Sequence, residues 1–321
     1  MSKNKTIAQT PSPAAGKVYN FCAKKRLILI TTICVIAALI VGIIVRGVNL
    51  AIEFEGGTLI TYSYTGEIDT NQIKSTAEGI INVPVNVRTG ESLDSDGYQV
   101  TLSFNSEEGL NADRQFELTE ALTAAFPDNQ LELFDSSDVS PSSGREFLLK
   151  CLVAMLAAAI LIIIYIALRF KNIGGWSAGV CSIFALCHDL IAALATSIIC
   201  GFEFNANVVA VILTILGYSI NNTIVIYDRI RENRTLYPKA SLNELINMGC
   251  SQSLKRSIRT SITTIGTMVV VSIVVFVSGY TSLLSFSIPL IFGLISGTYS
   301  SLFVAPVTWS WWKGKKAVKE V

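Results

Sequence analysis

Long apolar segments recur along this chain, separated by short polar turns and, once, by a polar insert of about one hundred residues. An α-helix rises 1.5 Å per residue, so about 20 apolar residues cross a hydrocarbon core of about 30 Å. Six segments reach this length and are predicted to be transmembrane helices: 27–45, 147–168, 176–200, 208–227, 258–278 and 284–309. Short polar tails are expected at 1–26 and 310–321.

The insert, residues 46–146, carries shorter periodic runs. Its strands are predicted at 58–64, 83–87, 98–104 and 131–134, and its helices at 70–79 and 111–126. Pro84 lies within the second strand and therefore indicates a sheet edge, because proline cannot donate to a strand ladder. This βαββαβ order is that of a ferredoxin-like domain. The expected fold class is thus an α-helical polytopic membrane protein with a small α+β domain between its first and second transmembrane helices.

Within this domain, Asp69 is predicted to cap the first helix. The second helix is expected to bury one face carrying Phe116, Leu118, Leu122 and Ala125. A separate amphipathic helix is predicted at 241–256, lying at the membrane surface before the fifth span.

Two glycine-containing segments join the insert to the membrane. Phe54-Glu55-Gly56-Gly57 follows the first span, and a Ser-Pro-Ser-Ser-Gly sequence at 140–144 precedes the second. Such segments are by default flexible linkers. Alternatively, Gly56 and Gly57 permit tight backbone packing or a positive φ at a hinge. The sequence leaves both interpretations open.

Charge is strongly segregated along the chain, although the net charge is only +1. Hydrophobic residues make up 51% of the chain and charged residues 15%, which is typical of a membrane protein. Lysine and arginine gather at span ends on one side, whereas the opposite loops at 202–207 and 279–283 have none. The positive-inside rule therefore predicts a multi-pass plasma-membrane protein with both termini cytoplasmic. The insert, with 18 acidic and 5 basic residues, is expected outside.

Residues able to carry chemistry are sparse. None of the seven cysteines lies in the insert, no CxxC occurs, and His188 is the single histidine. There is no phosphate loop, HExxH or nucleophile–base arrangement. We therefore expect no catalytic residues, no cofactor, no metal site and no nucleic-acid partner, so the chain is not expected to be an enzyme.

Polar side chains within the predicted spans are the principal functional candidates. His188 and Asp189 lie near the middle of the third span, where a charge costs roughly 2.5–3.5 kcal/mol. Ser219 and Asn222 share a face of the fourth span, with Asn221 turned about 100° away. Ion or proton handling and ordinary helix–helix hydrogen bonding are both open interpretations of these groups.

The fifth and sixth spans carry further patterns of this kind. Arg256 shares a helix face with Thr260, Thr263 and Thr267, and this face is expected to hydrogen-bond with the polar face of the fourth span. Arg256 could equally be an ordinary headgroup arginine. In the sixth span, a GxxxG motif at 293–297 permits close helix approach, and Pro289 and Pro306 indicate a kink or frayed end.

Several motifs occur in an order and spacing that resembles the SecF-like members of the SecD/SecF family of protein-export membrane proteins. They are Phe54-Glu55-Gly56-Gly57, the return at 140–144, Arg169-Phe170, His188-Asp189, Phe204-Asn205, Gly217–Thr223, and the segments 227–233, 252–257 and 260–264. The resemblance implies pairing with SecD in a pseudo-symmetric bundle of the RND type. It also implies association with the SecYEG channel and ion-gradient-assisted export of unfolded polypeptide. SecD is expected to be a separate chain, and membrane lipid surrounds the bundle.

Position 222 departs from that family pattern, which usually has an aspartate there that takes part in ion coupling. An amide cannot take up a proton near neutral pH. Asp189 could carry the charge instead, an aspartate of SecD could carry it alone, or coupling could be absent. A further hypothesis is that Asn222 serves as a fixed hydrogen-bond partner of Arg256 or of the partner's carboxylate. The alternative functions are a passive scaffold for SecD and the channel, and a solute exporter.

Overall fold

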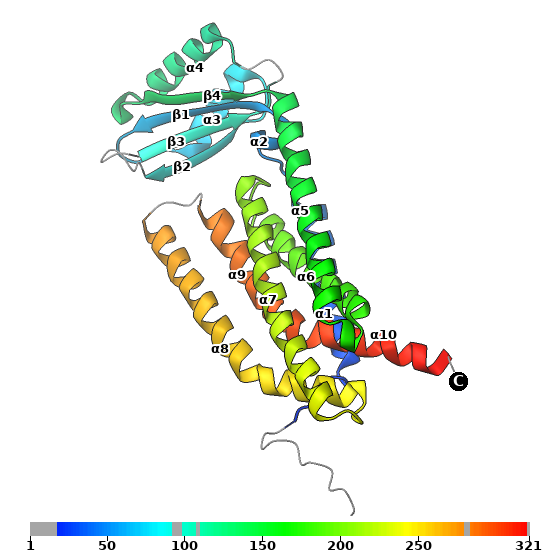
Figure 1. The fold of residues 1–321 in the computed structure, drawn as a ribbon. Helices are drawn as coiled ribbons and strands as arrows, with labels where there is room; N and C mark the ends of the chain where they lie inside the picture. Colours follow the sequence, from blue (N-terminus) through cyan, green and yellow to red (C-terminus); the bar gives the residue numbers. More distant parts are fainter. Residues whose placement is uncertain (1–17, 92–97, 107–109, 279–282, 320–321) are drawn as a thin grey trace, which may run out of the picture.

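A computed structural model describes residues 18–91, 98–106, 110–278 and 283–319. A helical bundle stands below a small α+β domain, and the long helix α5 (Pro141–Arg169) runs from the domain down the side of the bundle (Figure 1). The larger part of the predicted tail at 1–26, and most of the loop at 279–283, lie outside the described residues.

The six predicted spans are confirmed. Within the described residues, six helices are long and apolar enough to cross a membrane. They are α1 (Lys25–Arg46), α5, α6 (Gly175–Ile199), α7 (Ala206–Leu236), α8 (Leu242–Val277) and the helix that begins with α9 (Leu284–Tyr299). The most apolar windows of α6, α7 and the span Leu284–Lys313 are 56%, 50% and 61% buried, against 11% for α1, α5 and α8. Helices α6 and α7 and the span that begins with α9 therefore form the centre of the bundle.

The predicted surface helix at 241–256 is not separate from the fifth span. Residues Leu242–Val277 form one continuous helix, which begins at a capping box made by Ser241 and Glu244. No proline interrupts this stretch, and Leu245, Ile246 and Cys250 are buried against the bundle. Continuous burial on one face therefore holds the first turns in line with the apolar span. Helix α7 likewise continues past the predicted end at 227 to Leu236.

The predicted sixth span at 284–309 is interrupted. After α9, a π-helical turn (Ser300–Val304) leads into α10 (Ala305–Lys319), which leaves the base of the bundle sideways (Figure 1). Pro306 cannot donate a backbone hydrogen bond, and π turns are a recognised cause of helix kinks. The side chain of Trp309 is fully buried, and its Nε1 donates to Ser177 Oγ at the start of α6 (3.0 Å).

The inserted domain has the predicted ferredoxin-like topology. In the described part, an antiparallel sheet has the order β2-β3-β1-β4 and two helices cover one face. The elements are β1 (Gly57–Tyr64), α3 (Thr70–Ile81), β2 (Asn86–Glu91), β3 (Tyr98–Phe104), α4 (Ala112–Ala125) and β4 (Glu132–Val139). Asp69 caps α3 as predicted, and the strand after Pro84 is an edge strand as predicted, although it spans Asn86–Glu91.

The prediction that Phe116 lies on the buried face of α4 is wrong. Leu118 and Leu122 are fully buried, whereas Phe116 is 71% exposed. Phe116 lies two positions before Leu118, and at about 100° per residue its side chain points about 200° around the helix from the buried face. The remaining short elements are α2 (Ile52–Glu55) and the 3-10 turns Pro127–Asn129 and Lys171–Ile173.

Candidate functional site

A carboxylate lies at the centre of the bundle where three helices meet. The Asp189 side chain, on α6, is 0% exposed. Ser219 Oγ from α7 and Ser300 Oγ from the π turn each donate to Asp189 Oδ2 at 2.6 Å. Ser296 Oγ from α9 donates to Oδ1 at 2.7 Å. Both oxygens of one acid are therefore held by hydroxyls from the neighbouring elements.

His188 extends this polar centre on one side. Its Nδ1 lies 3.2 Å from Ser296 Oγ and 3.4 Å from Asp189 Oδ1, and its Nε2 is buried with no hydrogen-bond partner among the described residues. The imidazole lies beside the Tyr299 ring, with centroids 6.1 Å apart, and the Tyr299 hydroxyl is 2.7 Å from Thr31 Oγ1 of α1. The ring of Tyr299 thus lies between His188 of α6 and Thr31 of α1.

Two glycines of α9 permit this close convergence. A Cβ on Gly297 would lie 3.2 Å from the Ser219 Cβ and 3.6 Å from Asp189 Oδ2. A Cβ on Gly293 would lie 2.1 Å from the Ile215 Cδ1. The GxxxG motif therefore provides the close helix approach that the sequence suggested, and it brings α9 directly against the carboxylate.

Hydroxyl groups, and no lysine or arginine side chain of the described residues, surround the Asp189 carboxyl group. No lysine or arginine among the described residues forms an ion pair with Asp189. Serine hydroxyls can both donate and accept hydrogen bonds.

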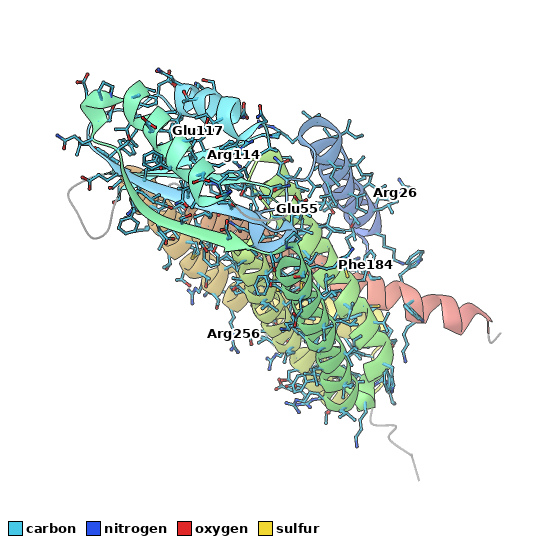
Figure 2. All side chains as sticks on the ribbon, turned by 90° about the horizontal axis from the view of Figure 1, so that it is seen from above. Arg26, Glu55, Arg114, Glu117, Phe184 and Arg256 are labelled. Carbon is cyan, nitrogen blue, oxygen red and sulfur yellow. The ribbon has the colours of Figure 1, made fainter. Side chains whose placement is uncertain are left out.

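Asn222 and Arg256 are not brought together in the described part of the chain. The Asn222 side chain is 5% exposed, and its Nδ2 has no partner among the described residues. Arg256 is exposed on α8, at the edge of the bundle seen from above (Figure 2). Asn221 is also exposed. The expected hydrogen bonds between these two polar faces are therefore not formed among the residues that the structure describes.

A serine face of α8 turns inward instead of the arginine face. Ser253, Ser257 and Ser261 are buried at four-residue spacing. Tyr218 Oη donates to Ser261 Oγ at 2.9 Å, and Thr298 Oγ1 donates to the same oxygen at 2.7 Å. Arg256 precedes Ser257 by one residue and so points about 100° away. The four-residue spacing of these serines, and of Ser296 and Ser300, was the available sequence signal for the residues missed.

The junction between domain and bundle is packed, not flexible. Gly56 has φ +88°, and a Cβ there would lie 2.6 Å from the Pro141 backbone. A Cβ on Gly144 would lie 2.8 Å from the Phe54 carbonyl. Phe54 is buried and stacks on Phe147, with centroids 5.5 Å apart. The linker interpretation of both segments is therefore wrong, and the glycines serve close backbone contact between α2 and α5.

Charged side chains add a second contact between domain and bundle. Arg88 of β2 forms an ion pair with Glu203 in the loop between α6 and α7. Glu53 Oε2 accepts from the Ala206 N–H at the start of α7 (2.8 Å). Burial raises the pKa of Glu203 above its usual value, and this outweighs the opposing effect of Arg88. The domain is thus joined to the bundle through both ends of the insert and through β2.

No group of three or more histidine, cysteine, aspartate or glutamate side chains is placed to hold a metal ion within the part that the structure describes.

Fold and polar centre together define a polytopic membrane protein with an inserted ferredoxin-like domain and an intramembrane carboxyl group.

The chain belongs to the SecD/SecF family of protein-export membrane proteins. The family model described as "Protein export membrane protein SecD/SecF, C-terminal" matches residues 118–315, and the SecD/SecF GG motif matches residues 41–67. The second match contains the Gly56-Gly57 pair of the packed junction.

Similar proteins agree in sequence and in fold. The protein translocase subunit SecF of Rickettsia akari is 34% identical over 261 residues, covering 81% of this chain and 80% of that protein. The SecDF of Bacillus subtilis is 32% identical over 94% of this chain. The crystal structure of a translocon-associated SecDF from Thermus thermophilus superposes with a TM-score of 0.75 at 29% identity and covers 93% of this chain. This chain spans 39% of the length of each of these two SecDF proteins.

Proposed function

We propose that this chain is an auxiliary, non-enzymatic subunit of the Sec preprotein translocase. It acts with a SecD-like partner and a SecYEG-type channel. Together they promote polypeptide export, and an ion gradient assists this process. Both termini lie in the cytoplasm in this proposal, as the lysine and arginine distribution favours. The observation that carries the proposal is the wholly buried Asp189, hydrogen-bonded by serines from α7, α9 and the π turn.

Asp189 takes the proton-carrying role that Asn222 cannot fill. A change of charge at the meeting point of three helices alters the hydrogen bonds between them. Because α6 and α7 are joined by the loop that holds Glu203, a rearrangement there acts directly on the contact with Arg88. The packed junction at Gly56 supports transmission to the outside domain through α5.

The exposed polar face of α8 supports a helical partner. Arg256, Thr260, Thr263 and Thr267 are all exposed, and Asn221 is exposed on neighbouring α7. Lipid tails offer such side chains no hydrogen bonds, so polar residues in spans normally face other helices or water. We place the SecD-like partner on this face. Expected evidence is that Thr263→Trp reduces partner co-purification, whereas Leu156→Trp on the exposed apolar surface of α5 leaves it unchanged.

The deciding experiment is pulse-chase export of a signal-bearing precursor in cells in which this protein is the only SecF-type subunit. Export is measured with and without a protonophore. The export rate of the native protein is expected to fall when the gradient is removed. The Asp189→Asn variant is expected to export slowly even with the gradient, and its export rate should fall little further when the gradient is removed. Asn222→Asp in the Asp189→Asn background tests whether a carboxylate at position 222 restores gradient dependence.

A passive scaffold is the second candidate, and the amide at position 222 favours it. The same variants separate the two functions. A scaffold predicts that Asp189→Asn keeps both the native export rate and partner co-purification, while deletion of the chain loses the complex. Normal gradient-dependent export by Asp189→Asn would exclude Asp189 as the proton carrier.

A further inference from the structure

A cavity opens at the end of the bundle farthest from the outside domain. Its volume is about 720 Å³, and its walls come from the end of α5, the turn at 171–175, the first turns of α6 and the side of α10. Within the described residues, its lining includes the amines of Lys171 and Lys313 and no carboxylate. The indole side chains of Trp176 and Trp312 also line it, and both are exposed.

The lateral course of α10 makes this cavity. Trp309 anchors α10 to the start of α6 through its hydrogen bond to Ser177 Oγ. Four residues later, Lys313 extends over the α5–α6 turn. A Cβ on Gly174, whose φ is +98°, would lie 2.7 Å from the Lys313 Nζ. The Lys313 amine therefore lies directly over Gly174, and the positive φ at this position favours glycine.

The position of the cavity relative to the membrane restricts what could fill it. It lies where the apolar spans α5 and α6 end, and α10 leaves sideways at this level (Figure 1). Exposed tryptophans typically lie at the headgroup level of a bilayer. Neither Lys171 nor Lys313 forms an ion pair with a described residue, so both amines are available to an anion.

We propose that this cavity binds the phosphate headgroup of an anionic phospholipid. Lys171 and Lys313 would both contact the phosphate, with Trp176 and Trp312 against the glycerol region and upper acyl chains. Basic pockets at helix ends facing a membrane surface have this binding chemistry. The apolar walls at Ala167 and Val180 fit the lipid and not a free phosphate ion.

The test is lipid binding by native mass spectrometry on the full-length protein, delipidated in a mild detergent. Phosphatidylglycerol and phosphatidylcholine of the same acyl chains are titrated separately. We expect phosphatidylglycerol to bind at least about fivefold more tightly, because each lysine near an anionic headgroup adds affinity. The variant K171Q/K313Q is expected to lose this preference, and K171R/K313R, which keeps both charges, to retain it.

The matched control is K239Q/K255Q, which removes two exposed lysines that do not line the cavity. It is expected to bind phosphatidylglycerol like the native protein. Equal binding of both lipids by the native protein, native affinity in K171Q/K313Q, or equal loss in the control would each overturn the proposal. Glycerol phosphate is added as a competitor, and displacement of the lipid at millimolar concentration would also overturn it, because the site would then bind free phosphate. Thermal unfolding of each variant verifies that it is folded.

Discussion

At the scale of the residue, the environment of Asp189 explains how an acid can be held in the middle of a membrane bundle. Its two oxygens accept three hydroxyl bonds of 2.6–2.7 Å. Hydrogen bonds to a charged group are worth about 1.5–3 kcal/mol each, whereas neutral ones between membrane helices average about 0.6 kcal/mol. The cost of removing one hydroxyl therefore reports the charge on Asp189.

Ser219→Ala removes one donor to Asp189 Oδ2. If the carboxyl group is ionised in the resting protein, we expect a loss of about 1.5–3 kcal/mol in the free energy of unfolding at neutral pH. Ser301→Ala is the matched control, since that buried hydroxyl donates only to the Thr298 carbonyl of its own helix (3.2 Å). Chemical unfolding in lipid nanodiscs measures both variants. Equal and small losses would indicate a neutral Asp189.

At the scale of the element, the crossing of α2 and α5 depends on glycines whose role differs from that of other glycines nearby. Gly56 and Gly47 both have positive φ with an extended ψ, a backbone region that is essentially restricted to glycine. Gly56 is also pressed against the Pro141 backbone, whereas a Cβ on Gly47 would meet nothing within 4 Å. Substitution at the two positions therefore separates backbone strain from crowding.

Gly47→Ala is expected to lower the free energy of unfolding by about 1–3 kcal/mol through backbone strain alone. Gly56→Ala adds a clash that only displacement of the first turn of α5 can relieve. Because Arg145 lies in that displaced segment, limited trypsin digestion should cleave Gly56→Ala after Arg145 faster than Gly47→Ala or the native protein. Identical cleavage of the two variants would show that the crowding has no consequence.

At the scale of the whole molecule, the domain and the bundle are joined by a charged contact that responds to pH. Burial raises the pKa of Glu203 above the usual glutamate value of 4.5, so the folded protein holds this proton more tightly than the unfolded chain. Stability rises with pH only where the unfolded state binds more protons. Here the folded state binds more, so the contribution of Glu203 to stability falls as pH increases from 4.5 through the raised pKa.

Glu203→Gln should therefore flatten the dependence of the thermal midpoint on pH in this window. Arg88→Gln leaves the buried Glu203 carboxylate without its cation. It should therefore extend the pH range of this dependence to higher pH, and it should lower the thermal midpoint at neutral pH. Glu117→Gln, on the exposed side of α4, is the control and should follow the native profile (Figure 2). A Glu203→Gln profile that superimposes on the native one would contradict this assignment.

Much of the molecule could be predicted from the sequence because its patterns are local. The length of the apolar segments determined six spans, and period-two alternation with Asp69 as a cap determined the ferredoxin-like domain. The boundaries were less predictable. Nothing between 256 and 258 breaks a helix, so the surface helix and the fifth span join, and the π turn at Ser300–Val304 redirects the last helix.

The candidate site was predictable only in its titratable members. His188 and Asp189 could be identified because burying a charge in a bilayer costs free energy. The serines could not, because a serine within a helix can donate its hydroxyl hydrogen bond to the backbone of its own helix. The sequence by itself thus determined the number of spans, the inserted domain and the presence of a buried acid. Only the tertiary structure decided which helix faces meet: it turned Arg256 outward, placed Ser219, Ser296 and Ser300 on Asp189, and packed Gly56 against Pro141. The physical reason is that helical periodicity defines the faces of each helix, while packing among several helices selects the face that is buried.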